Sequence, residues 1–142
     1  MGQSLHFQRI KCFDVKTIEK FNYEDILRTL VALLGKEKSE IDETIYSLVF
    51  EPIEEISTYI SANEPKLEKL LGTGAKNLLH PNSRCYLVTE ELWKVIEEMI
   101  WELAISALKS SEQSQETSKE YFKDLGILTI LYTQKILMVE AS

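Results

Sequence analysis

The stretch VTEELWKVIEEMIWELAISALK, residues 88–109, is the longest segment of the chain with sustained helical periodicity. Its apolar residues recur every three or four positions, which gathers side chains on one face of a helix. These residues are Leu92, Val95, Ile96, Met99, Ile100, Leu103, Ala107 and Leu108. Thr89 is a suitable N-cap, and Glu90 and Glu91 follow in the first turn, where the helix dipole favours negative charge. We therefore expect the rest of the chain to pack around this helix.

Two further helices are indicated upstream. Asn22 is placed to cap a helix that ends at Gly35, a residue suited to a left-handed C-cap. Ser39 is placed to cap the next helix. Pro52 interrupts its pattern, so the helix either bends there or a new one starts and continues to about residue 61.

The C-terminal third is less uniform. Residues 110–118 are polar and predict a mobile loop. Thr117 and Glu120 have the spacing of a capping box, which predicts a helix starting there. Residues 127–139 fit either a continuing helix, which the periodicity favours, or a hairpin that turns near Thr133.

The first residues do not resemble a helix. Residues 1–15 alternate imperfectly between apolar and polar side chains, which suggests an extended arm or a short edge strand. Together these patterns predict one all-α domain spanning residues 1–142. It would contain about five to seven helices packed around the long helix 88–109, with short β-strands at one or both ends.

Composition excludes several classes of protein. The chain has 142 residues with 44% hydrophobic and 27% charged side chains, values typical of a globular domain and not of a disordered one. A net charge of −7 opposes broad attraction to nucleic acid or anionic membrane. Cys12 and Cys85 are far apart and fit no disulfide framework, and no apolar run could span a membrane. We expect a soluble, cytoplasmic protein.

Clustered glutamates are the first candidate for chemistry. In helical nucleotide pyrophosphohydrolases, paired acidic motifs on neighbouring helices hold a divalent cation. A metal-dependent helical hydrolase of this kind would need four residues to converge here: Glu54, Glu55, Glu98 and Glu102. Their spacing does not reproduce those motifs, and a solvated acidic helix face explains them more simply.

Other motifs are weaker. Residues 72–76 contain two glycines but lack the phosphate-loop spacing, and His80 with Cys85 has no zinc-type neighbours. We therefore predict no catalytic, cofactor-binding or metal-binding residue, and an enzymatic role is not favoured.

Residues 63–126 loosely resemble half of a histone fold, with a short helix, a loop at Arg84, a long helix and a second short helix. This resemblance implies a nucleic-acid-associated protein that would contact phosphate through the basic N-terminal arm at Arg9 and Lys11. The acidic balance of the chain opposes that role.

Trp101 is the best functional hint in the sequence. It falls among glutamates on the side of the long helix opposite the apolar stripe, while Trp93 borders the stripe. Trp101 either marks a contact surface or belongs to a helix that is buried more than half-way round. The sequence thus favours a non-enzymatic protein–protein interaction module, an adaptor or regulatory subunit that self-associates as a dimer or binds another protein. The predicted interface consists of Trp93, Glu97, Ile100, Trp101 and Ile105.

Overall fold

The structure is a computed structural model of the chain. The structure describes residues 3–11, 13, 20–54, 59–62, 71, 78, 84–109 and 112–141. Within them the helices are α2 (Tyr23–Leu34), α3 (Lys38–Val49), α5 (Glu90–Leu108) and α6 (Glu112–Thr133). The strands are β1 (Gln3–Ile10), β2 (Phe50–Pro52), β3 (Tyr59–Ala62), β4 (Cys85–Leu87) and β5 (Leu137–Ala141).

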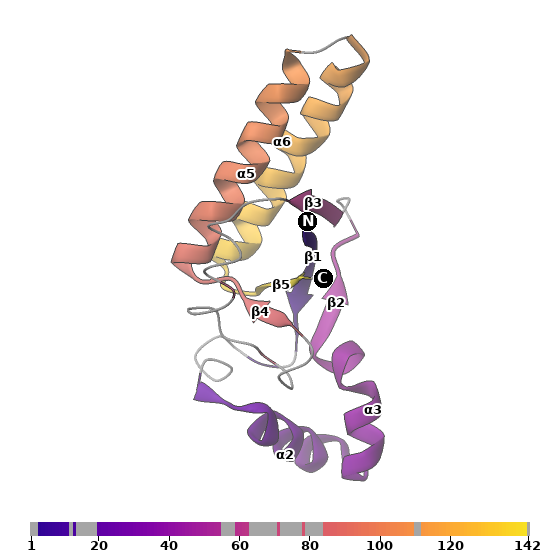
Figure 1. Cartoon of the computed structure of the whole chain (residues 1–142). Helices are drawn as coiled ribbons and strands as arrows, with labels where there is room; N and C mark the ends of the chain where they lie inside the picture. The colour runs from indigo at the N-terminus through magenta and orange to yellow at the C-terminus, as the bar shows by residue number, and fades with distance from the viewer. Residues whose placement is uncertain are drawn as a thin grey trace.

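The predicted all-α fold class is wrong. The described residues form four helices and an antiparallel sheet, so the protein has a mixed α and β architecture, although helix is its commonest element. Figure 1 shows the sheet in the middle, with the α5–α6 hairpin extending away on one side and α2 and α3 on the other. The predicted long helix 88–109 corresponds to α5, but within the described residues five to seven helices do not pack around it.

Strand β1 is the centre of the sheet. The strand order is β2-β1-β5-β4, and β3 also pairs with β1 on the edge that carries β2. Residues 3–6 of β1 pair with β3 and residues 8–10 with β2, while residues 5–9 pair with β5 on the other edge. Residues 3–10 therefore form an interior strand of the sheet and not a short edge strand.

Each face of the sheet has its own hydrophobic core. Leu5 and Phe7 of β1 belong to the cluster under α5 and α6, whereas Ile10 belongs to the cluster under α2 and α3. In β5, Val139 belongs to the first cluster and Met138 to the second, as alternation along a strand requires. Because both faces are covered, β5 is almost continuously buried and its sequence LMVEA does not alternate.

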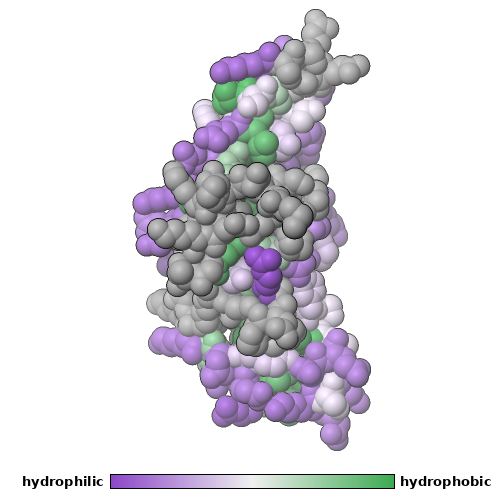
Figure 2. Space-filling view, viewed as in Figure 1, coloured by the Kyte–Doolittle hydropathy of each residue, from purple (hydrophilic) through white to green (hydrophobic). Residues whose placement is uncertain are grey.

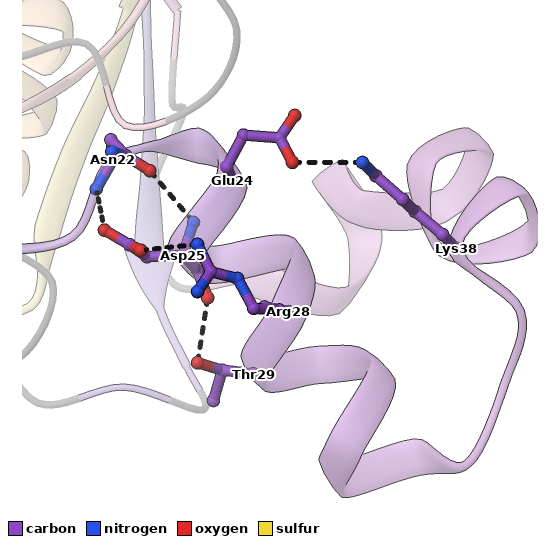
Figure 3. Close-up of polar contacts among 6 residues, drawn as sticks. All are labelled: Asn22, Glu24, Asp25, Arg28, Thr29 and Lys38. Atoms are coloured by element: carbon purple, nitrogen blue, oxygen red, sulfur yellow. Dashed lines mark hydrogen bonds and ion pairs between the residues drawn. The ribbon is translucent and has the colours of Figure 1, made fainter.

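Helix α2 forms for the reasons that its sequence indicates. The Asn22 side chain accepts a hydrogen bond from the Asp25 backbone N–H at 2.9 Å, and the Asp25 carboxylate accepts one from the Asn22 backbone N–H at 3.1 Å. Gly35 ends the helix with φ of 65°, in the left-handed region. Figure 3 shows this cap and the Glu24–Lys38 ion pair of 3.0 Å that links α2 to α3. The pair is exposed, so we expect it to add little stability.

The segment after α3 differs from the sequence prediction. Ser39 does not cap α3, since Glu37 occupies the N-cap position without a side-chain cap bond. Beyond Val49 the chain enters β2 instead of bending within a helix. Pro52 ends this edge strand, where its missing N–H costs no interior ladder bond. Residues 59–62 are strand β3, so the helix expected to continue to residue 61 is also wrong.

The C-terminal third contains two corrections. Helix α6 starts at Glu112, so residues 112–118 are helical and not a loop, and Thr117 lies inside the helix. Residues 127–139 are neither one helix nor a hairpin. Helix α6 continues to Thr133, the chain turns with Lys135 at φ of 60°, and β5 follows.

The likeness to a histone fold does not extend to the topology. Arg84 directly precedes strand β4, where that pattern needs a loop between helices, and α6 is 22 residues long where it needs a short helix.

Candidate functional site

The candidate site is the outer surface of the α5–α6 hairpin. Thr89 caps α5 by accepting a hydrogen bond from the Leu92 N–H at 3.5 Å. The inner face of α5 is buried against the sheet and α6 through Leu92, Trp93, Ile96, Ile100 and Ala104. Because a helix turns about 100° per residue, the position after Ile100 points sideways from this face. This position is Trp101, and its side chain is 52% exposed.

Helix α6 supports Trp101 from the side. The rings of Trp101 and Phe122 meet edge to face with centroids 5.2 Å apart. Aromatic pairs of this geometry contribute roughly 0.5–1.5 kcal/mol beyond burial. Trp101 is thus held against a neighbour while half of it faces solvent. Phe122 was not among the predicted interface residues, because only the antiparallel pairing of the two helices places it there.

A hydrogen bond joins α5 and α6 close to the Trp101–Phe122 pair. Ser118 is fully buried, and its hydroxyl donates a hydrogen bond of 2.8 Å to the carbonyl of Ala104. Two small side chains at this crossing let the helices approach closely. The hairpin therefore presents Trp101 on a rigid support.

A surface hollow adjoins Trp101. It is lined by Lys94, Glu97, Glu98 and Trp101. Lys94 forms an ion pair of 3.5 Å with Glu90, one helical turn earlier. In the part of the chain that the structure describes, no ion pair uses Glu97 or Glu98. Figure 2 shows hydrophilic side chains over much of the projecting α5–α6 hairpin, with some hydrophobic side chains exposed between them.

The five predicted interface residues do not share one surface. Trp101 and Glu97 are exposed, and Ile105 is half-buried. Trp93 is 5% exposed and stacks on Tyr132 at 5.0 Å, and Ile100 is 1% exposed. Trp93 and Ile100 therefore belong to the core, and the exposed surface of α5 is narrower than the sequence suggested.

A second polar cluster lies on the opposite face of the sheet. The Gln8 amide donates to the Tyr46 hydroxyl at 2.7 Å, and the Cys85 thiol donates to the Glu140 carboxylate at 3.6 Å. Burial, followed by Glu140 and Cys85, raises the pKa of Tyr46 above its usual range. A phenol with a raised pKa stays protonated at neutral pH and is a poor acid–base catalyst. The cluster is better explained as the polar link between α3 and the sheet.

The described residues of the hydrolase alternative, Glu54, Glu98 and Glu102, are not brought together as a metal site. Glu98 and Glu102 are exposed on α5, Glu54 is exposed after β2, and Glu55 lies outside the described residues. Among the residues that the structure describes, no group of three or more His, Cys, Asp or Glu side chains could hold a metal ion. His80 and residues 72–76 also fall outside that part of the chain.

The basic arm of the nucleic-acid alternative is partly used within the fold. Arg9 forms an ion pair of 3.3 Å with Glu51 across the β1–β2 pair, and Lys11 follows the end of β1. The Arg9 charge is therefore already matched by a carboxylate.

None of the helices in the described segments has the length and apolar character that crossing a membrane requires.

Comparisons of the chain with protein-family models, curated proteins and solved structures found no match.

Proposed function

We propose that this protein is a non-enzymatic protein–protein interaction module whose contact surface is the outer side of the α5–α6 hairpin around Trp101. The observation that carries the proposal is a half-exposed tryptophan held edge to face by Phe122 on a projecting helical hairpin. An adaptor or regulatory subunit in the cytoplasm would use such a surface.

The energy available at Trp101 is that of an interface anchor. A tryptophan buries up to roughly 250 Å² in a core or interface, so the exposed half of Trp101 offers roughly 100 Å² to a partner. At about 25 cal/mol per Å² its burial would contribute roughly 2.5 kcal/mol. Contributions of this size define the few residues that dominate an interface. Preordering by Phe122 lowers the entropy cost of fixing the ring on binding.

The experiment is site-specific photo-crosslinking in the cells that make this protein. A benzophenone amino acid replaces Trp101 in one variant. In the control variant it replaces Ile130, which is 58% exposed on α6 outside the proposed surface. We expect a discrete adduct from position 101 and little or none from position 130. Circular dichroism of the purified variants checks that both keep their helix content.

The mass of the adduct identifies the kind of partner. An adduct of twice the chain mass indicates self-association, which the sequence also favours. In that case light scattering should show a dimer for the wild type and a monomer for Trp101→Glu. Any other mass indicates a different protein. Equal crosslinking at both positions, or none at position 101, would refute the proposed surface.

A further inference from the structure

The charges on the two helices around Trp101 are mostly negative. Helix α5 carries five glutamates and one lysine, and that lysine, Lys94, is paired with Glu90 at 3.5 Å. Helix α6 carries three glutamates, one aspartate and two lysines, of which Lys119 is paired with Glu116 at 3.2 Å and Lys123 is exposed. Glu97, Glu98 and Lys94 line the hollow beside the indole, and all three are exposed. The hollow therefore combines an aromatic side chain and two carboxylates, whose charge no described ion pair offsets, with one lysine that is paired with Glu90.

This combination matches one kind of side chain. The face of an indole attracts a cation more strongly than other aromatic rings do. Carboxylates beside the ring add charge-assisted hydrogen bonds to a guanidinium or ammonium group. The aliphatic stem of arginine or lysine can cover the apolar part of the ring while its charged head reaches the carboxylates. Resting on the proposed function, we infer that the hairpin binds a basic segment of another protein, with an arginine or lysine side chain over Trp101 between Glu97 and Glu98.

The same charges oppose the other occupants. In a symmetric dimer the same patch meets itself, so the glutamates of one α5 would face those of the second copy. Like charges placed together at an interface weaken association. Phosphate groups of nucleic acid or anionic lipid would be repelled in the same way. A different protein with a basic segment is the occupant that the surface complements.

The inference is tested with a defined probe. The probe is a fluorescently labelled helical peptide of 15 residues with arginines beside a leucine stripe, and its control peptide has glutamine at every arginine position. Binding is measured by fluorescence anisotropy to the wild type, Trp101→Ala and the double variant Glu97→Gln/Glu98→Gln. The double variant Glu43→Gln/Glu54→Gln removes the same charge from exposed positions outside the hairpin.

We expect the arginine peptide to bind and the glutamine peptide to bind far more weakly. Removing Glu97 and Glu98 weakens binding by about five- to tenfold, consistent with two solvent-exposed charge contacts, and Trp101→Ala does so at least as strongly. The change at Glu43 and Glu54 weakens binding less than about twofold, because screening shortens the reach of distant charges.

Two results would overturn the inference. If the two double variants lose the same affinity for the peptide, binding depends on net charge only. If Trp101→Ala does not change the affinity, the peptide binds elsewhere or not at all. These failures are distinct from failure of the proposed function. An adduct at position 101 with an acidic or neutral segment, or with a second copy of the chain, would support the proposed interaction surface but contradict the inference of a basic partner.

Discussion

Asp124 makes the stability of this fold depend on pH in a direction opposite to that of most carboxylates. It lies on the inward side of α6, is 5% exposed, and its Oδ1 atom has no hydrogen-bond partner among the residues that the structure describes. Burial, followed by the nearby Glu120, raises its pKa from 3.8 to about 6, and Lys123 opposes the rise only weakly. Between these values the folded chain holds a proton that the unfolded chain has released.

The sign and size of the effect follow from linkage. A carboxyl with a raised folded-state pKa has no effect on stability below the unfolded pKa, and it costs stability progressively as the pH rises through the folded pKa. A shift of about two units at about 1.36 kcal/mol each sets an upper limit of about 3 kcal/mol. Because Glu120 and Lys123 are exposed and screened by solvent, we expect about 1–3 kcal/mol.

Asp124→Asn removes the ionisation and keeps the size of the side chain. We expect the variant to match the wild type at about pH 3.5 and to be more stable by about 1–3 kcal/mol at about pH 8. Urea denaturation followed by circular dichroism at several pH values measures this difference. The control variant is Asp42→Asn, which removes one carboxylate from an exposed position of α3. If the gain of Asp124→Asn is the same at every pH, the group does not titrate as argued.

Three further substitutions test the packing, each by urea denaturation at neutral pH. Ser118→Ala should cost about 1 kcal/mol through the lost hydrogen bond to Ala104, and no loss would show that this bond does not contribute to helix pairing. Asn22→Ala should also cost about 1 kcal/mol, because the Asn22 side chain caps α2. Glu37→Ala should cost far less, because the Glu37 side chain makes no cap bond to α3, and equal costs would contradict this difference between the two caps. Trp93→Ala should cost about 3–5 kcal/mol, and a loss below about 1 kcal/mol would contradict its place in the core.

The parts of the fold that the sequence predicted well are those with local causes. The α2 helix follows from the Asn22 cap and the Gly35 stop, and the α5 helix follows from its apolar period and the Thr89 cap. Each of these signals acts within a few residues. The exposed position of Trp101 also follows from the helical period of α5 alone, which is why the sequence could single it out.

The sheet was missed because its causes are distant along the chain. Strand β1 pairs with residues 50–52, 59–62 and 137–141, and no sequence signal near residues 3–10 indicates those partners. Strand β5 is buried on both faces, so it lacks the alternation that marks a half-exposed strand. The polar start of α6 also depends on a distant contact. The sequence predicts a loop there, but Ser118 is stabilised within the helix by its hydrogen bond to Ala104 of α5 and not by its own helix propensity.

The pairing of β1 with β5 also sets the order in which the protein can be completed during synthesis. Phe7 pairs with Val139, so the central strand must wait until residue 139 has left the ribosome before its second edge is covered. At roughly 5–20 residues per second this delay is roughly 7–26 seconds. Helices α2 and α3 lie within the first 49 residues and can form earlier. During this delay β2 and β3 can cover only the first edge of β1, so its second edge stays open to pairing with another chain.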